Sequence, residues 1–307
     1  MKKQWKRLAA LSSAAVMAAG TLLYFPTDTL QNISWGITAS AEETGAVKWT
    51  KIEDDNLTWT LYNNGTLTIS GSGAMQDYDY NSPAFYNSNI KKVVIEDGVT
   101  SIGDNAFPNC AGLESIEIPS GVTSIGDFAF SRCSSLTSIT IPSSVTSIEA
   151  SAFEDCSSLT SITILGDVTS IGYNAFSDCT SLNSITIPKS VKSIENNAFS
   201  GCTALTEVLL EGGSTLTYTD LGVDANKVVT RWNEGDLTWT LTADGTMTIS
   251  GKGAMKDYNS ADNSPAYDKS NIIKVVIEDG ITSIGNDAFS VCTGLTSITI
   301  PVGCDFA

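Results

Sequence analysis

The chain has 307 residues, of which 17 % are charged, and its formal charge at pH 7 is −17. A surface this acidic repels phosphate backbones and anionic lipid heads, so we expect no nucleic-acid partner, and it also helps to keep a protein soluble. The chain contains no histidine, which excludes the common Ser–His and Cys–His nucleophile pairs and the usual histidine metal ligands.

The first 41 residues resemble an export signal. A basic head precedes an apolar run from Leu8 to Phe25, and Ala39-Ser40-Ala41 fits a small-residue cleavage site. We therefore predict that residues 1–41 are a signal peptide. An uncleaved anchor is the alternative, because about 18 apolar residues can just span a bilayer. No second apolar stretch follows, so we expect no membrane span after cleavage. The residues of the basic head are Lys2, Lys3, Lys6 and Arg7.

Residues 42–92 are predicted to form an N-terminal β-hairpin cap. Apolar and polar residues alternate from Leu57 to Leu61, and a second alternating run follows the turn signal Asn64-Gly65. Such a module covers the first coil of a repeat array, which would otherwise expose a strand edge and an apolar core. We expect Trp59 on the apolar face of the hairpin; a ligand platform is its alternative role.

A unit of 23 residues recurs over residues 93–210, and a repeat of this length predicts a solenoid, here an array of five coils. Two rows of identical residues step by 23 and are expected to form the core. The first row is Phe107, Phe130, Phe153, Phe176 and Phe199. The second row is Cys110, Cys133, Cys156, Cys179 and Cys202.

Each coil is expected to contain one half-buried strand and one shorter inward contact. Ile139 and Ile141 alternate with polar residues, which predicts a strand that Pro142 ends. Val145 and Ile148 are expected to make the shorter contact.

Two turns are expected in the rest of the coil. Ala152-Phe153 is predicted to form a tight helical or 3₁₀ turn. A glycine follows the last isoleucine in four coils, where we expect the backbone to turn. These glycines are Gly103, Gly126, Gly172 and Gly285.

The sequence contains seven cysteines, and a recurring inward slot favours free, buried thiols over disulfides. Neighbouring coils lie about 5 Å apart, so distance alone does not exclude a bridge. Side chains stacked in parallel nevertheless suit a disulfide poorly. No Cys-x-x-Cys pair occurs, so no metal site is expected. Cys304 lies outside the row, and its role is left open.

The second half of the chain repeats the first in shorter form. We predict a linker over residues 211–230, a second β-hairpin cap over residues 231–274 and a partial second array over residues 275–307. Trp239 and the turn signal Asp244-Gly245 correspond to the first cap. A sixth copy of the coil supplies Phe289, Cys292 and Leu295. Because this array holds little more than one coil, one interpretation is a fragment of a larger surface protein.

The run L-x-x-I-x-I-P-x-x-V-x-x-I-G-x-x-A-F-x-x-C covers residues 93–210 and 275–301 and resembles the BspA-type bacterial leucine-rich repeat family. Leu165 departs from the pattern by replacing the proline. The resemblance implies a mainly β, right-handed leucine-rich-repeat solenoid of 23-residue coils with β-hairpin capping modules. It also implies a secreted or bacterial cell-surface protein that attaches to an extracellular protein or glycan.

The outward strand positions form a hydroxyl-rich face with little charge, and we expect any binding to occur there. The alternative is that serine and threonine are merely adequate exposed strand residues, so that the chain is a structural spacer without a ligand. No catalytic pair, phosphate loop or calcium loop is recognisable, so we predict a non-catalytic chain without cofactor or metal. The candidate binding residues are Glu114, Glu117, Thr137, Thr140, Thr160, Thr163, Asn183 and Thr186.

Overall fold

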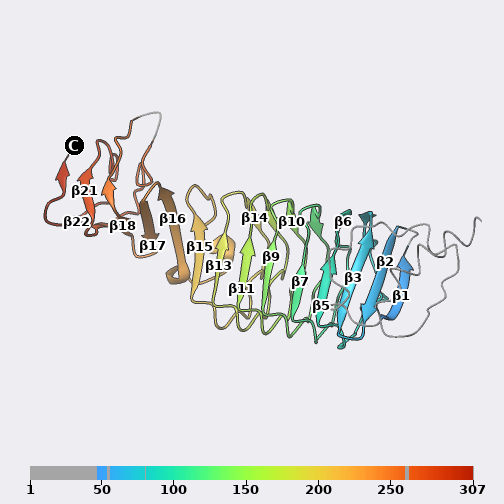
Figure 1. Cartoon of the computed structure of the whole chain (residues 1–307). Coiled ribbons are helices and arrows are strands. Elements are labelled where there is room, and N and C mark those ends of the chain that lie inside the picture. Colours follow the sequence, from blue (N-terminus) through green and yellow to red (C-terminus); the bar gives the residue numbers. More distant parts are fainter. Residues whose placement is uncertain (1–46, 54–55, 80, 260–262, 307) are drawn as a thin grey trace, which may run out of the picture.

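The computed structural model describes residues 47–53, 56–79, 81–259 and 263–306. The predicted signal peptide, residues 1–41, lies outside the described residues, as does the start of the first cap. In the described part of the chain, no helix has the length and apolarity needed to cross a membrane. The chain is mainly β and winds into an elongated solenoid of stacked coils (Figure 1).

One wall of the first array consists of one strand per coil. Successive side chains of a strand point to opposite faces, so the isoleucines point inward and the hydroxyl side chains outward. We call the outer side of these strands the sheet face. Strands β9 to β15 pair in parallel at the 23-residue step, as Ser161 does with Ser138. The strands are β7 (Ser115–Glu117), β9 (Ser138–Ile141), β11 (Ser161–Ile164), β13 (Ser184–Ile187) and β15 (Glu207–Glu211).

The second wall is a parallel sheet of four two-residue strands. Ile148 lies in one of these strands and Val145 just before it; both are buried and make the shorter inward contact of their coil. These strands are β8 (Ser124–Ile125), β10 (Ser147–Ile148), β12 (Ser170–Ile171) and β14 (Ser193–Ile194).

The third wall is a run of hydrogen-bonded turns where the sequence predicts a tight helical or 3₁₀ turn. We call it the turn edge. Ser151 and Asp155 have left-handed backbones, with φ of 52° and 58°, and a right-handed helix does not continue through such residues. The N–H of Phe153 donates to the Ala175 carbonyl of the next coil at 2.8 Å. Hydrogen bonds between coils therefore add to the short bonds within each turn, such as that from the N–H of Glu154 to the Ser151 carbonyl at 3.1 Å.

The glycines after the last isoleucine stand where each short strand ends and the turns begin, and they also allow close approach between coils. A Cβ atom on Gly103 would lie 2.0 Å from the Gln76 carbonyl oxygen, and one on Gly126 would lie 2.3 Å from Asp104 Oδ1. Neither glycine has a positive φ. The absent side chain, not backbone freedom, is what these positions require.

The core of the first array is a continuous stack of phenylalanine rings. Phe107, Phe130 and Phe153 are fully buried, and successive rings lie 5.2 to 5.7 Å apart at angles of 6° to 10°. The cysteines run beside this stack and are free thiols. Each thiol donates to a carbonyl of the preceding coil, as Cys156 does to Phe130 O at 3.2 Å.

Each cap adds a tryptophan to the start of an aromatic stack. Ala84 lies 23 residues before Phe107, so the cap has no phenylalanine at this step. Trp59, which is fully buried, fills the space with its ring 5.2 Å from that of Phe107. In the second cap Trp239 lies 5.7 Å from Phe289 in the same way.

The two caps have matching strands. The first contains β1 (Val47–Glu53), β2 (Leu57–Tyr62), β3 (Thr66–Gly71) and β4 (Gly73–Ala74), followed by β5 (Lys92–Ile95) and β6 (Val99–Ser101). The second contains β16 (Val228–Glu234), β17 (Leu237–Thr242), β18 (Thr246–Gly251) and β19 (Gly253–Ala254), followed by β20 (Lys274–Ile277) and β21 (Ile281–Ile284). The last coil holds β22 (Ser297–Thr299) and β23 (Asp305–Phe306).

The segment predicted as a linker, 211–230, is structured. It contains α3 (Tyr218–Leu221), η1 (Ala225–Lys227) and the start of β16, which pairs in parallel with β15. Leu216 and Leu221 are buried against the last coil of the first array. The repeat pattern is lost here because this segment closes one core and begins the next sheet strand.

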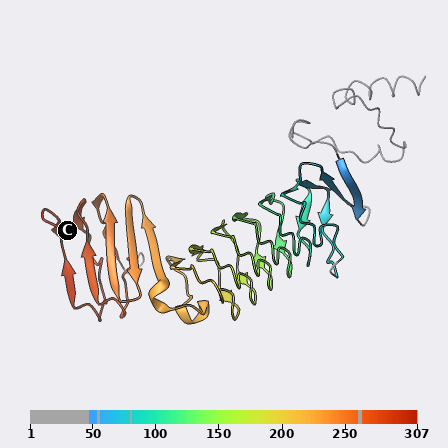
Figure 2. The ribbon, with the colours of Figure 1, turned by 90° about the horizontal axis from the view of Figure 1, so that it is seen from below.

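One sheet therefore joins two separate hydrophobic cores. The order β22-β20-β18-β17-β16-β15-β13-β11-β9 is continuous, but the buried residues form one cluster from Leu57 to Leu221 and another from Leu237 to Ala288. The axis of the molecule changes direction between these parts (Figure 2). The second cluster is the less protected, since Phe289, Cys292 and Leu295 are only partly buried.

Candidate binding surfaces

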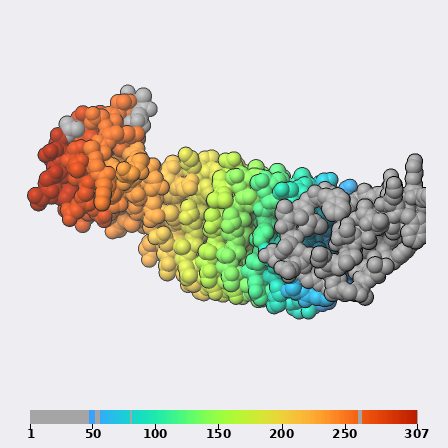
Figure 3. Space-filling view, viewed as in Figure 1, coloured from blue at the N-terminus to red at the C-terminus, as the bar shows by residue number. Residues whose placement is uncertain are grey.

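The predicted binding residues lie together along the sheet face. They extend from β7 to β13 or sit directly before these strands, and all except the half-buried Thr186 are exposed. The array forms one continuous body on the side shown in Figure 3. The sheet face is therefore an extended surface rather than an enclosed site.

The two glutamates of this row are held in ion pairs. Lys91 Nζ lies 3.7 Å from Glu114 Oε1, and Lys92 Nζ lies 2.6 Å from Glu117 Oε1. More than half of each glutamate side chain is exposed, so each pair contributes at most about 1 kcal/mol to stability. These carboxylates have lysine partners already, which reduces their value as contacts for a ligand.

Some threonine hydroxyls hold neighbouring coils together. Thr160 Oγ1 donates to Thr137 O at 3.0 Å, and Thr206 Oγ1 donates to Asn183 O at 3.1 Å. The same arrangement recurs on the other wall, where Thr169 Oγ1 donates to Thr146 O at 3.1 Å. Thr160 is therefore part of the solenoid framework as well as of the sheet face.

Four threonines of the row have no hydrogen-bonded hydroxyl within the described residues: Thr137, Thr140, Thr163 and Thr186. Thr140 and Thr163 face outward from neighbouring strands and are aligned in register. Their hydroxyls can donate and accept hydrogen bonds outward. These residues are the strongest part of the predicted sheet-face site.

A row of aspartates on the turn side serves the backbone of the next coil. Asp77 Oδ1 accepts from the N–H of Asp104 at 3.0 Å, and Asp104 Oδ1 accepts from the N–H of Asp127 at 2.7 Å. Desolvation raises the pKa of Asp104, and the charges of Asp77, Asp127 and Glu149 add to this effect. Across the described residues, no group of three or more Cys, Asp or Glu side chains has a geometry suited to a metal ion.

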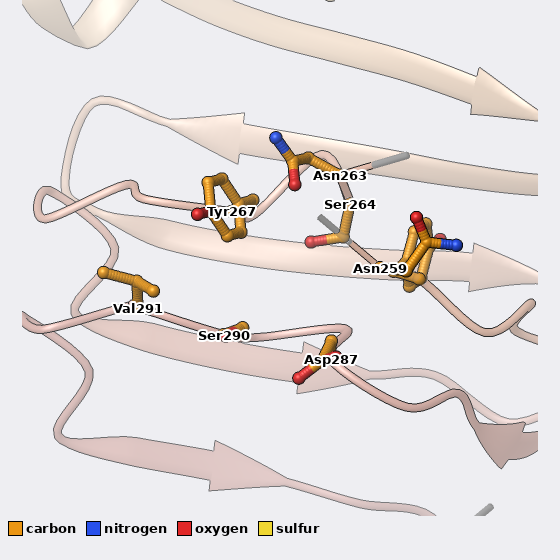
Figure 4. A pocket seen from close by; sticks show the side chains of 8 residues that line it. Asn259, Asn263, Ser264, Tyr267, Asp287, Ser290 and Val291 are labelled. Atoms are coloured by element: carbon orange, nitrogen blue, oxygen red, sulfur yellow. The ribbon is translucent and has the colours of Figure 1, made fainter. Parts of the chain in front are cut away.

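A first hollow lies in the second array and has a volume of about 190 Å³ (Figure 4). Its lining includes the rings of Tyr258 and Tyr267 and the polar side chains of Asn263 and Asp287. The Tyr258 hydroxyl donates to Glu234, and this hydrogen bond fixes the tyrosine ring in the lining of the hollow. Asn259, Ser264, Ser290 and Val291 complete the lining.

A second, more open hollow of about 400 Å³ lies on the turn edge of the first array. We call it the turn-edge groove. Its lining comes from four successive coils and contains no large aliphatic side chain. The polar and aromatic residues are Tyr86, Asn109, Arg132, Ser134, Asp155 and Ser157.

Sequence reasoning missed this groove because its residues differ in chemistry from coil to coil. Tyr86, Asn109, Arg132 and Asp155 are spaced by 23 residues, and all have positive φ values, between 52° and 60°. The available signal was the frequency of Asn, Asp and Gly in this slot, since these residues tolerate a left-handed backbone.

Comparison with known proteins agrees with the repeat pattern. The model of the BspA type leucine rich repeat region matches six copies, over residues 79–206 and 263–305. The chain belongs to the BspA-type leucine-rich repeat family. No curated protein matches this BspA-type chain.

Solved structures of leucine-rich repeat proteins resemble this BspA-type chain at low identity. A protein from Eubacterium ventriosum is 21 % identical with a TM-score of 0.43; the match covers 85 % of this chain but only 62 % of that one. A cell surface protein from Faecalibacterium prausnitzii is 25 % identical with a TM-score of 0.37, over 83 % and 77 % of the two chains. The pneumococcal vaccine antigen PcpA is 17 % identical with a TM-score of 0.39, over 84 % and 72 %.

Proposed function

We propose that this BspA-type chain is an exported, non-catalytic protein, secreted or held at the bacterial surface, that binds an extracellular protein or glycan through the sheet face. The observation that carries the proposal is the outward row of Thr140, Thr163 and Thr186, whose hydroxyls have no partner within the described residues. Residues on a regular sheet are held in place before binding, which lowers the entropy cost of association.

A binding role is favoured over catalysis by the chemistry of the chain. The chain has no histidine, and the carboxylates of the sheet face, Glu114 and Glu117, are exposed and paired with lysines. A carboxylate that acts as a general acid or base needs a shifted pKa and a site shielded from water. The sheet face is exposed to water and gives no such shielding. A structural spacer without a ligand is the second candidate, favoured by the monotony of its Ser and Thr residues.

The proposal is tested by applying residues 42–307 to arrays of matrix proteins and glycans. Saturable binding to at least one component is expected. The double variant Thr140→Lys with Thr163→Lys should weaken this binding by about tenfold or more, because two long charged side chains replace short hydroxyls at the contact.

The matched control adds the same two charges elsewhere, through Ser200→Lys with Thr203→Lys on the exposed turn edge. This control should retain binding. Equal weakening by both double variants would argue against the sheet face, and no saturable binding to any component would favour the spacer.

A further inference from the structure

The turn-edge groove presents a different surface from the sheet face, and its residues vary where the sheet face is uniform. Successive coils place Tyr86, Asn109, Arg132 and Asp155 at the same backbone position. A row in which each coil supplies another functional group is suited to discriminating between ligands. A row of equivalent threonines offers the same contact repeatedly.

Backbone hydrogen bonds hold these residues in place. The N–H of Asn109 donates to Ser131 O at 2.8 Å, and the N–H of Arg132 donates to Glu154 O at 2.7 Å. Because each left-handed residue is tied to the next coil, its side chain leaves a fixed backbone. The groove is therefore organised before any ligand arrives.

The side chains of the groove offer hydrogen bonds and one aromatic surface. The Asn109 amide and the Ser134 and Ser157 hydroxyls have no hydrogen-bond partner within the described residues. Arg132 Nε donates to Asp155 Oδ2 at 3.3 Å, which orients both planar groups. The ring of Tyr86 is 63 % exposed and packs edge-on against Phe85 with centroids 4.5 Å apart.

These groups favour a saccharide over a protein side chain. Protein interfaces usually depend on a cluster of anchors in well-packed, desolvated pockets, whereas this groove is open, is lined mainly by polar groups and holds one aromatic ring. A sugar presents many hydroxyls, which pair with amide, carboxylate and guanidinium groups. Its apolar C–H face can pack on an aromatic ring such as that of Tyr86.

The charge and length of the groove narrow the class of saccharide. The charged groups of the groove, Arg132 and Asp155, pair with each other and leave no surplus positive charge for a sulfated or sialylated sugar, and the chain as a whole carries a formal charge of −17. The groove crosses four coils, about 14 Å at the spacing of parallel strands. A short, neutral oligosaccharide matches both properties.

We propose that the turn-edge groove is a binding site for a neutral oligosaccharide, with Tyr86 as the stacking surface and Asn109, Arg132 and Asp155 as hydrogen-bonding groups. The site is on a different wall from the sheet face and does not depend on it. Binding there is expected to be weak for a single groove, because the hollow is shallow and open to water.

The test uses saturation-transfer NMR and calorimetry on residues 42–307 with chitotetraose, cellotetraose or mannotetraose, each alone. At least one tetrasaccharide should bind saturably. Tyr86→Ala should raise its Kd by about tenfold or more through loss of the stacking surface. Asn109→Gly should do the same, since glycine keeps the left-handed backbone and removes only the amide.

Two controls are matched to these changes. Tyr173→Ala removes another exposed tyrosine that does not line the groove, and Asp178→Gly alters the same slot in the next coil. Both should bind the tetrasaccharide normally. So should Thr140→Lys with Thr163→Lys, which separates this proposal from the sheet-face function.

Three results would overturn the proposal. The first is that none of the three tetrasaccharides binds. The second is that Tyr86→Ala and Tyr173→Ala weaken binding equally. The third is that Tyr86→Ala abolishes binding to a deglycosylated matrix protein while the tetrasaccharides do not compete, which would assign the groove to a protein partner.

Discussion

At the scale of single residues, the row of buried thiols contributes to packing rather than to reactivity. Desolvation by burial raises the pKa of Cys156 to about 12 and that of Cys202 to about 11. The thiolate is the reactive form, so these groups are inert near neutral pH. Each thiol also donates to a carbonyl of the preceding coil, and the row thus links one winding to the next.

The raised pKa of Cys156 predicts a specific pH dependence of stability. A free thiol has an ordinary pKa of 9.0, so above pH 9 the unfolded chain loses this proton while the folded chain keeps it until about pH 12. The stabilisation that depends on this proton is fully present below pH 9. Above pH 9 the free energy of unfolding falls by about 1.4 kcal/mol per pH unit because of this group. The cost of Cys156→Ala should therefore shrink by about 2 kcal/mol between pH 7 and 10.5.

Urea unfolding of the wild type and the variant at both pH values measures this difference. Leu159→Ala is the matched control, because it empties the same fully buried layer without removing a titrating group. Its cost should stay constant with pH. A constant cost for Cys156→Ala as well would show that burial does not shift this thiol.

At the scale of the elements, each cap continues the core of its array as well as covering a strand edge. Ala84 and Ala266 are fully buried small residues that leave room at the phenylalanine step. Trp59 and Trp239 enter from the hairpins to fill that room. The pairing of strands and the packing of aromatic rings therefore both begin in the cap.

Because the two cores are separate, loss of a cap tryptophan should affect only its own array. Trp239→Ala removes a fully buried ring and should cost about 3–5 kcal/mol within the second core. Hydrogen exchange should then lose protection over residues 237–306, while the first array stays protected. Trp59→Ala should give the opposite pattern.

A milder variant isolates the role of the ring. Trp239→Phe keeps an aromatic side chain and removes a buried Nε1–H that has no hydrogen-bond partner among the described atoms, so it should cost less than the alanine change. Equal loss of protection in both arrays after Trp239→Ala would contradict the separation of the cores.

Much of each coil could be predicted from the sequence, because the 23-residue step and the alternation in Ile139 to Ile141 follow from burial alone. The family follows from the same pattern. The close contact at Gly103 could not be predicted, since it depends on the carbonyl of Gln76 in the preceding coil. The turn-edge groove could not be predicted from residue type, because Tyr86, Asn109 and Arg132 share only a backbone conformation.

At the scale of the whole molecule, Trp232 and Gly212 form the joint between the two arrays. Trp232 packs against the second core, and Lys269 Nζ lies 5.7 Å from the centroid of its ring. A Cβ atom on Gly212 would lie only 2.0 Å from Trp232 Cδ1. The N–H of Gly212 also donates to Arg231 O at 2.6 Å. This joint thus contains a close contact that only glycine permits.

Gly212→Ala should therefore loosen or redirect this joint without unfolding either core. We expect a change in the small-angle scattering profile and a red shift in tryptophan fluorescence as Trp232 becomes exposed. Gly121→Ala is the control, because its Cβ would meet the Val99 carbonyl at an ordinary distance of 3.4 Å. If both variants scatter as the wild type does, this contact does not determine the bend.

The pairing of β16 onto β15 shows that a finished array can be extended by a fresh hairpin along one uninterrupted sheet. Each added winding lengthens the rod by a fixed increment of about 4.8 Å. Duplication of whole units therefore changes reach in regular steps while leaving earlier windings undisturbed. The number of windings therefore sets the distance between the two ends of such a rod.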